Sequence, residues 1–294
     1  MQAIAPSELM VNSDGSIFHL HLKPEQLADT VILVGDPARV HTITRFFNTV
    51  ESQQQSREFV SATGTYKGCR VTVLSTGIGT DNIDIVLNEL DALANIDLST
   101  RIPKSSHRRL RLVRIGTSGA LQPDIPIGSL LLSAISIGFD GLLNWYASHS
   151  GVTLPDYEAA FVQHMKWSNR LPAPYFVPNS SELINLLAPI SSAGMTISAP
   201  GFYGPQGRVL RLPLQDPNLL EKIESFRYNG HRICNFEMEG SAIAGLSALL
   251  GHQAATICLI IANRYQMQSN TSYNSLMDGF IQKVLDKLTE KSSQ

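Results

Sequence analysis

The sequence predicts an α/β protein, built as a three-layer sandwich around a central, twisted, mixed sheet. Short apolar runs of strand length alternate with amphipathic runs of helix length along the chain. Polar residues and glycines directly follow several of the apolar runs, and open α/β sheets bind their ligands at such strand ends. No internal repeat or interdomain linker stands out, so we expect a single domain over residues 1–294, with residues 1–15 flexible.

The composition is that of an ordinary globular protein. Hydrophobic residues make up 43% of the chain and the net charge is −2, which favours neither a nucleic-acid partner nor a disordered acidic chain. Cys69, Cys234 and Cys258 lie in or beside apolar segments without CxxC spacing, which indicates reduced thiols rather than a disulfide framework or a zinc site. No apolar stretch reaches the ~20 residues that span a bilayer. We therefore expect a cytoplasmic location and no membrane partner.

Near the N-terminus, residues 16–22 alternate in polarity and predict a short strand. His19 and His21 share one face of this strand. Alone, a histidine there indicates only a solvated surface residue.

The apolar strand Thr30–Val34 ends in a tight turn that leads into a helix. Gly35 allows the backbone to approach a ligand closely, and Pro37 suits the first helical position. Arg39 is placed to reach an anion held over the start of the helix. The alternative is an ordinary turn with a solvated arginine.

Residues 57–75 predict a hairpin that turns at residues 66–69, followed by the glycine-rich run 75–79. Apolar residues at helical spacing then predict a helix over residues 82–94, packed on the sheet. A dinucleotide-binding fingerprint is disfavoured because Asn82 stands where its third glycine is required.

The most basic segment of the chain is predicted to be a solvated loop insertion over residues 97–111. It carries Arg101, Lys104, Arg108, Arg109 and Arg111 among serine and proline. No aromatic residues are interleaved for stacking on bases, which disfavours a nucleic-acid site.

Arg114 lies inside the next apolar strand, residues 112–115, and is followed by Gly116, Thr117, Ser118 and Gly119. An arginine is costly to bury unless an anion meets it. With hydroxyls and glycine amides beside it, Arg114 predicts half of an oxyanion or phosphate cradle.

The middle of the chain is predicted to place a recognition loop over the sheet. The apolar patterns predict strands at 129–137 and 194–199, a helix at 182–190, and loops with one short helix over 140–180. In the loop that follows, Phe202 is placed to stack on a ring while Gln206 and Arg208 bond its edges. A surface Ω-loop without a ligand is the alternative.

Two carboxylates, Glu237 and Glu239, stand where an apolar strand runs into a helix of small residues over 240–250. In extended geometry both would share one side of the strand. One interpretation is a pair of first-turn glutamates favoured by the helix dipole. The other is a carboxylate that grips a polyol such as a ribose diol. A buried strand over 254–262 and a closing helix over 273–288 complete the pattern.

Taken in order, these motifs resemble those of the nucleoside phosphorylases of the uridine phosphorylase type. The resemblance runs from about Phe18 to Leu288. It rests on Phe18-His19-Leu20, Gly35-Asp36-Pro37 with Arg39, Arg57-Glu58-Phe59, Ser75 to Gly79, Arg114 to Gly119, Gln206 with Arg208, Glu237-Met238-Glu239, and Asn263-Arg264.

The resemblance implies a role for each matched residue. The phosphate ligands are expected to be Gly35, Arg39, Arg114 and Thr117, with Arg57 supplied by a neighbouring subunit. Glu239, the Met238 backbone and Arg114 would hold the ribose hydroxyls, and the neighbour's His19 would meet the 5′-hydroxyl. Gln206 and Arg208 would bond the uracil edge, with Phe202 stacking nearby and Arg264 marking the pyrimidine branch. The catalytic set is therefore Arg208, Gln206, Glu239 and Arg114.

The implied reaction is reversible phosphorolysis of uridine, with deoxyuridine as a further candidate substrate, to uracil and ribose 1-phosphate in pyrimidine salvage. Inorganic phosphate is the co-substrate and no cofactor is required. A potassium ion at Glu58, Ile78 and Asn82 is implied by the family. Because His19 and Arg57 would act across an interface, a homodimer is the smallest active unit, and the family implies a homohexamer.

Three alternatives remain open from the sequence. A hydrolytic nucleosidase would not need three arginines around a water molecule. A purine nucleoside phosphorylase is disfavoured by Arg264, because purine enzymes of the family place an aspartate there. A non-catalytic nucleoside-binding relative would be expected to have lost some of the matched residues.

Overall fold

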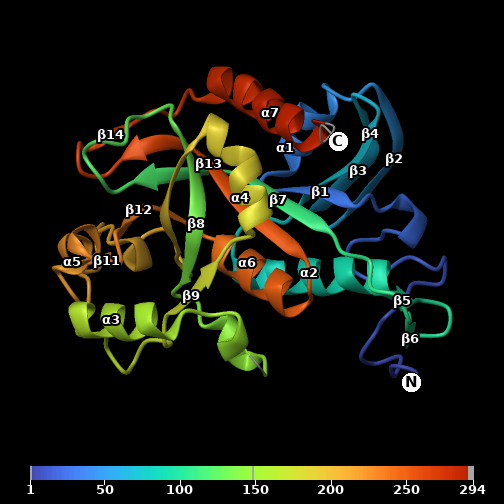
Figure 1. Ribbon diagram of the computed structural model, residues 1–294, viewed down its shortest axis with the longest axis horizontal. Helices are drawn as coiled ribbons and strands as arrows, with labels where there is room; N and C mark the ends of the chain where they lie inside the picture. The colour runs from blue at the N-terminus through green and yellow to red at the C-terminus, as the bar shows by residue number, and fades with distance from the viewer. Residues whose placement is uncertain (1, 148, 291–294) are drawn as a thin grey trace.

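The structure, a computed structural model, describes residues 2–147 and 149–290 and has the three-layer α/β architecture that the sequence predicts (Figure 1). In this part of the chain a twelve-stranded mixed sheet forms the middle layer. Its strands are β1 (Thr30–Val34), β2 (Thr49–Ser56), β3 (Phe59–Tyr66), β4 (Cys69–Ser75), β7 (Arg111–Ala120), β8 (Leu130–Gly138), β9 (Tyr175–Pro178), β10 (Ser192–Ser198), β11 (Arg227–Tyr228), β12 (His231–Glu237), β13 (Gln253–Asn263) and β14 (Gln268–Ser269). A separate ribbon pairs β5 (Ile96–Asp97) with β6 (Ile102–Pro103).

Helices cover both faces of this sheet. They are α1 (Pro37–Thr44), α2 (Thr80–Asn95), α3 (Pro155–Met165), α4 (Ser181–Leu187), α5 (Leu219–Ser225), α6 (Gly240–Leu249) and α7 (Asn274–Thr289). Short 3₁₀ turns lie at Pro24–Gln26, Leu142–Trp145, His149–Gly151, Ala188–Ile190 and Gly204–Gln206. Figure 1 shows α1, α4 and α7 on one face and α2 and α6 on the other.

The alternation of side chains along each strand explains why both faces are covered. In β1, Val31 and Leu33 belong to the apolar cluster that includes α2 and α6, whereas Ile32 and Val34 belong to the cluster that includes α1 and α7. A strand buried on both faces needs a continuous apolar run, which is what β1 has. A third cluster packs α3 and α5 against the far end of the sheet.

The topology brings several strand ends together at one edge of the sheet. The strand order is β11-β12-β10-β8-β13-β7-β1-β4-β3-β2. β1 is parallel to β4 and β7, β13 is parallel to β7, and β10 is parallel to β12. The end of β7 also pairs with β12, so this half of the sheet closes on itself. β10 and β12 run opposite to β1, β4 and β13, so it is this closure that brings the segments after the strands together. Gly35 adjoins Gly77, the Gly79 N–H bonds Glu239, and Arg264 bonds the Gln206 carbonyl.

Several local predictions were wrong. Residues 16–22 are turns with one bridge between Val11 and Ile17, because the Glu89 carboxylate accepts the backbone N–H groups of His19 and Leu20 in place of a strand partner. Arg57 lies in the β2–β3 turn with a positive φ of 57°, so the hairpin strand begins only at Phe59.

Other differences concern element lengths. β7 continues through residues 116–120, beyond the predicted strand end at residue 115, because β13 pairs with it along this whole stretch. β2 and α5 were not predicted, since β2 is polar and half-exposed and α5 is short. The segment 140–180 contains α3 and β9.

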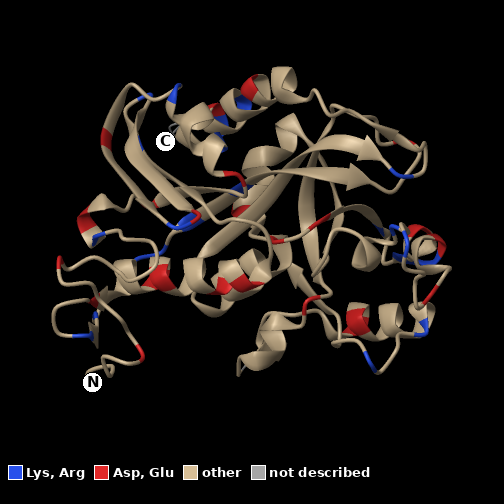
Figure 2. Ribbon diagram, turned by 180° about the vertical axis from the view of Figure 1, so that it is seen from behind, with Lys and Arg blue, Asp and Glu red and all other residues tan. Residues whose placement is uncertain are grey.

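Two N-terminal contacts involve the basic segment. The Ile4 N–H donates to the Arg101 carbonyl at 2.8 Å, and the Arg101 Nε donates to the Leu9 carbonyl at 3.1 Å. Leu9, in the segment expected to be flexible, is buried. Basic and acidic residues are interspersed in the view of Figure 2 rather than separated by sign. Across residues 2–147 and 149–290, none of the helices combines the length and the apolar character needed to cross a membrane.

Candidate active site

The centre of the site is a buried arginine between two buried carboxylates. Arg114 on β7 is 6% exposed, Glu237 at the end of β12 is 4% exposed, and Glu239 is 2% exposed. The Arg114 Nη2 pairs with Glu239 Oε2, and its Nη1 lies 3.4 Å from Glu237 Oε2. Both carboxylates therefore face the same guanidinium, although β12 ends at Glu237 and Glu239 lies outside the extended geometry that the sequence prediction assumed.

Glu237 and Glu239 differ in what else they contact. The Glu237 carboxylate accepts the backbone N–H groups of Glu239 at 2.9 Å and of Gly240 at 2.9 and 3.0 Å, and so caps the start of α6. Glu239 Oε1 instead accepts the backbone N–H of Gly79 at 2.8 Å, from the turn after β4. The first-turn interpretation was wrong for both residues, because α6 begins at Gly240: Glu237 caps the helix from the end of β12, and Glu239 joins two loops.

The charges of this cluster are coupled. Burial acts to lower the pKa of Arg114, but the carboxylates of Glu239 and Glu237 outweigh it and raise that pKa, so the guanidinium stays charged. Burial raises the pKa of Glu239, which Arg114 opposes and the charge of Glu237 reinforces. The two carboxylates and one arginine carry a formal charge of −1 when all are ionised.

The backbone around Arg114 makes room for its side chain. A Cβ at Gly116 would lie 1.9 Å from Arg114 Nη1, so this position requires glycine. The Nε of Arg114 is buried and has no hydrogen-bond partner among the described residues. A buried N–H without an acceptor requires an explanation, and a bound oxyanion would supply one.

A second set of residues forms a positive end beside this centre. Asp36 caps α1 by accepting the Ala38 N–H at 2.9 Å, which fixes Gly35 just before the helix and Arg39 in its first turn. A Cβ at Gly35 would lie 3.4 Å from the Gly77 carbonyl oxygen, so the turns after β1 and β4 are adjacent.

Arg39 is half-buried, and burial lowers its pKa, with the nearby charge of Arg114 adding to the effect. Arg39 makes no ion pair with a carboxylate in the described part of the chain. Thr117, half-buried, follows Arg114 on β7. Two guanidiniums that repel each other at the edge of a sheet suit an anion between them.

The loop after β10 forms the opposite end of the site. Arg208 Nη1 donates to Gln206 Oε1 and to the Phe202 carbonyl, both at 2.6 Å, and its guanidinium lies 3.8 Å from the centre of the Phe202 ring. Gln206 is buried, whereas Phe202 is half-exposed. Burial, followed by the charge of Arg264, lowers the pKa of Arg208 to about 10.

Arg264, which directly follows β13, holds this loop by its backbone. Its Nη1 donates to the Gln206 carbonyl at 3.0 Å and its Nη2 to the Gly207 carbonyl at 3.4 Å. Its side chain also passes 3.9 Å from where a Cβ of Gly119 would lie, so it connects the loop to the end of β7. Arg264 is therefore brought to the predicted base end, with its described bonds directed to the loop backbone.

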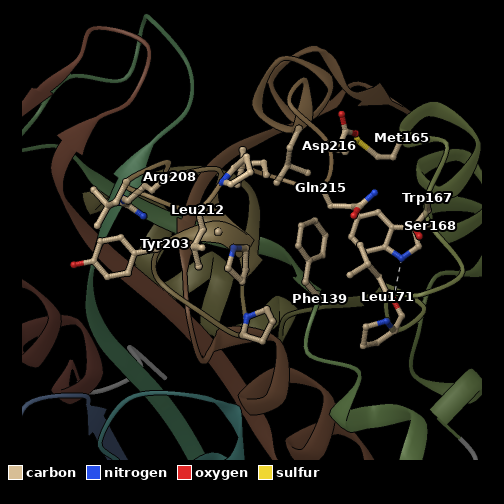
Figure 3. A pocket seen from close by; sticks show the side chains of 18 of the residues that line it. Phe139, Met165, Trp167, Ser168, Leu171, Tyr203, Arg208, Leu212, Gln215 and Asp216 are labelled. Carbon is tan, nitrogen blue, oxygen red and sulfur yellow. Dashed lines mark hydrogen bonds between the residues drawn. The ribbon is translucent and has the colours of Figure 1, made fainter.

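A cavity of about 1160 Å³ opens beside this loop. Figure 3 shows Tyr203 and Arg208 at one end of it and Met165, Trp167 and Asp216 at the other. Arg114 and Glu239 do not line it. The cavity is largely apolar and meets the site at the loop after β10, through Tyr203, Gly204, Pro205 and Arg208.

His19 and Arg57 lie together, apart from this cluster. The His19 Nδ1 contacts Glu89 Oε1 at 2.6 Å, and the Arg57 guanidinium lies 5.8 Å from the centre of the Phe18 ring. Within residues 2–147 and 149–290, neither forms a hydrogen bond or ion pair with Arg114 or Glu239. In the same region, Gly77 brings Glu58 and Asn82 together, because a Cβ on it would lie 3.3 Å from Glu58 Cγ and 2.5 Å from Asn82 Nδ2. Ile78 beside them is 69% exposed.

One group with metal-ligating side chains lies elsewhere, at Asp91, His107 and His252. The Leu110 N–H donates to His252 Nδ1 at 3.2 Å, so in the neutral ring the proton sits on Nε2, which lies 3.2 Å from Asp91 Oδ1. A metal-bound histidine instead donates its other N–H. This group is better explained as a histidine–aspartate contact.

Sequence reasoning missed some contacts of the site. The Gly79 amide and the Ser198 hydroxyl bind Glu239 and Glu237, respectively. The glycine-rich run at 75–79 was a signal for the first contact. Nothing in the local sequence marks Ser198, because only the pairing of β10 with β12 places it beside Glu237.

The sequence matches the family model of the phosphorylase superfamily over residues 29–292. The chain belongs to the phosphorylase superfamily. Among superfamily members, it is 27% identical over 270 residues to a uridine phosphorylase of Thermococcus kodakarensis, covering 90% of this chain and 83% of that protein. It is also 27% identical to a uridine phosphorylase of Escherichia coli, covering 87% of this chain and 89% of that one.

Two further superfamily comparisons bear on the site. A crystal structure of a Trypanosoma brucei nucleoside phosphorylase, described as showing uridine phosphorylase activity, superposes with a TM-score of 0.87 at 30% identity, covering 96% of this chain and 100% of that one. A DeoD-type purine nucleoside phosphorylase of Thermoanaerobacter matches a shorter part, 35% identical over 127 residues and covering 43% of this chain and 48% of that protein.

Proposed function

We propose that this protein catalyses the reversible phosphorolysis of uridine to uracil and ribose 1-phosphate. The observation that carries the proposal is the buried Arg114–Glu239 pair at a sheet edge that also holds Arg39 and the Gln206–Arg208 loop. The uridine phosphorylases to which the chain is similar over most of its length support it.

The positive end would bind inorganic phosphate. Arg39 and Arg114, with the Gly35 backbone and the Thr117 hydroxyl, offer charge-assisted donors for a doubly charged oxyanion. Arg57 of a neighbouring subunit would complete the set. Phosphate would then offset the repulsion between Arg39 and Arg114.

The centre would bind ribose, and the Gln206–Arg208 loop would bind uracil. Glu239 would accept the ribose hydroxyls beside Arg114 and the Met238 backbone, with His19 of a neighbouring subunit at the 5′-hydroxyl. Gln206 and Arg208 would bond the uracil edge next to Phe202, while Arg264 holds their loop in place.

The chemistry follows from the order of charges. As the glycosidic bond lengthens, the ribosyl group gains positive charge between a leaving base and an entering phosphate that are both negative. Gln206 and Arg208 would stabilise charge on the uracil oxygens, and Arg39 and Arg114 would position the nucleophile. Removing one such donor typically costs about 3 kcal/mol at the transition state. No step requires a covalent enzyme intermediate.

Two features favour this reaction over its alternatives. A hydrolytic nucleosidase needs no pair of arginines to hold water, whereas Arg39 and Arg114 form such a pair here. A purine phosphorylase would need an acid at the leaving base, but the position after Asn263 is Arg264, bonded to the loop.

The test is uracil release from uridine by the purified protein, with and without inorganic phosphate, followed by inosine under the same conditions. Release that requires phosphate supports the proposal. Release without phosphate would identify a nucleosidase, inosine cleavage a purine enzyme, and no reaction a binding protein.

Assembly is a further part of the proposal. We expect at least a homodimer, and a homohexamer by family resemblance, because His19 and Arg57 do not bind their own chain's Arg114 or Glu239. Mixing the inactive variants Arg57→Ala and Arg114→Met should restore activity. In a mixed dimer, one site combines the intact Arg114 of one chain with the intact Arg57 of the other. Failure to restore it in exchanged subunits would argue that each chain works alone.

A potassium ion remains a proposal for Glu58, Ile78 and Asn82. The structure brings the first and last of these side chains to Gly77, and a carboxylate, an amide oxygen and a backbone carbonyl are oxygen ligands that suit a hard cation. Activity in potassium phosphate should exceed that in a phosphate salt of a bulky organic cation if the ion contributes. The cytoplasmic location likewise stays a prediction.

A further inference from the structure

The two glutamates at the start of α6 differ in their unused hydrogen-bonding capacity. A carboxylate has about four lone-pair sites. Glu237 receives the Ser198 hydroxyl, the Glu239 N–H and the Gly240 N–H, and it also faces the Arg114 guanidinium. Its lone pairs are therefore all engaged by protein groups, and a substrate hydroxyl would have to displace one of them.

Glu239 has capacity left. Among the residues that the structure describes, each of its oxygens has one partner, the Gly79 N–H on Oε1 and Arg114 on Oε2. Two lone pairs thus remain, one on each oxygen, which is the arrangement that a vicinal diol can use. Of the two carboxylates, Glu237 is therefore saturated by protein groups, and Glu239 is available to a ligand.

Glu237 contacts two groups that position Glu239 for such a diol, the Glu239 backbone and the Arg114 guanidinium. It holds the Glu239 backbone N–H at 2.9 Å, and it lies 3.4 Å from Arg114 Nη1. With Nη1 facing Glu237, only Nη2 is directed to Glu239. Arg114 Nη1 also donates to the Cys258 Sγ at 3.6 Å, but a thiol sulfur is a weak acceptor and the Glu237 charge is the stronger hold on Nη1. Without that charge, Nη1 would be free to turn onto the second oxygen of Glu239 and occupy one of its two remaining lone pairs.

We propose that Glu237 is a positioning residue that keeps Arg114 on one oxygen of Glu239, and so leaves Glu239 free to accept the ribose diol. This inference rests on the proposed function. It assigns Glu237 no contact with the substrate. Its expected effect is on the discrimination between ribose and deoxyribose, because a substrate with one hydroxyl fewer gains less from Glu239.

The test compares uridine and 2′-deoxyuridine in Glu237→Gln. The amide oxygen can still accept the N–H groups at the start of α6, but the charge facing Arg114 is lost. We expect kcat/KM for uridine to fall about tenfold or more, the usual scale for one charge-assisted hydrogen bond, and that for 2′-deoxyuridine to fall much less. The preference for uridine should narrow accordingly.

Asp140 provides a matched control. It is a half-buried carboxylate that accepts from the Leu142 N–H at 2.8 Å, the Tyr175 hydroxyl at 2.9 Å and the Ser241 hydroxyl at 2.9 Å, and it pairs with no arginine among residues 2–147 and 149–290. Asp140→Asn should lower the melting temperature while leaving the preference for uridine unchanged. A general loss of stability is thereby separated from misplacement of Arg114.

If Glu237→Gln does not fold, Glu237→Asp takes its place, because it keeps the charge one methylene shorter and should narrow the preference only partly. A lower melting temperature with an unchanged preference for uridine would show that Glu237 is only a helix cap, and would overturn the inference. Wild-type protein that releases no uracil with phosphate would instead overturn the proposed function itself.

Discussion

Replacing Glu239 with glutamine separates activity from stability in this protein. Glu239 shares Arg114 with Glu237, so the buried cluster holds two carboxylates and one guanidinium. The glutamine is of nearly equal size and can still accept the Gly79 N–H. The change removes one negative charge and leaves Arg114 paired with Glu237 alone.

The magnitudes follow from this geometry. Loss of a charged contact to the reacting sugar should cost about 3 kcal/mol at the transition state, which is roughly a hundredfold in turnover. The free energy of unfolding at pH 8 should stay within about 1 kcal/mol of wild type or rise, because repulsion between buried like charges is relieved.

The pH dependence has a definite sign. Burial raises the pKa of folded Glu239 above its ordinary 4.5. The folded protein therefore binds the Glu239 carboxyl proton more tightly than the unfolded chain does. The free energy of unfolding falls as pH rises past the ordinary pKa of a glutamate, and this fall is complete once the pH exceeds the raised pKa of the folded protein. Glu239→Gln should remove that share of the pH dependence.

The assays are initial rates of uracil release with saturating phosphate and urea unfolding at several pH values. Glu158→Gln is the control. Glu158 lies on the helix α3 and accepts the Phe176 backbone N–H at 3.2 Å. Activity of Glu239→Gln within threefold of wild type would refute the assignment. A loss of more than about 2 kcal/mol of stability would refute the charge argument.

Three further predictions follow from single contacts. Arg208→Ala should lower uridine turnover about a hundredfold with little change in the free energy of unfolding, because Arg208 is partly exposed and, in the described part of the chain, its hydrogen bonds go to its own loop. Steady-state kinetics and a melting curve check this. Glu89→Gln should weaken the contact between the Glu89 carboxylate and His19 Nδ1, which are 2.6 Å apart, and so orient the His19 ring less well. The preference for uridine over 5′-deoxyuridine in competition assays should then fall. Gly116→Ala should abolish activity and lower the melting temperature, because its Cβ would overlap Arg114.

Each of these has an outcome that would contradict it. Unchanged turnover in Arg208→Ala would remove the base-recognition role, and an unchanged preference in Glu89→Gln would mean that His19 does not meet the 5′-hydroxyl. For the glycine, Gly279→Ala is the control: it lies in α7 with nothing within 4 Å, and it should stabilise the protein by about 1 kcal/mol. Equal effects at both glycines would contradict the steric argument.

The sequence by itself was sufficient for the layers of this protein and for the positions of most elements. β1, α2, β8, α6, β13 and α7 carry apolar residues at strand or helix spacing, and that pattern depends only on the local chain. The polar residues at the strand ends were also visible, because a charged or glycine-rich turn after an apolar run departs from the pattern of a core. Arg114 was recognisable for the same reason.

Only the tertiary structure determines which role each of those residues has. Glu237 and Glu239 have the same side chain and nearly the same local setting, so no local pattern shows that Glu237 is saturated by Ser198 and two amides while Glu239 keeps one unused lone pair on each oxygen. That difference arises from the pairing of β10 with β12 and from the approach of the β4 turn, both of which join segments far apart in the chain. Pairing with β13 likewise extended β7 beyond its apolar core, and the Glu89 carboxylate replaced a strand at residues 16–22 with a turn. Each of these features is set by long-range hydrogen bonds, which the local sequence does not encode.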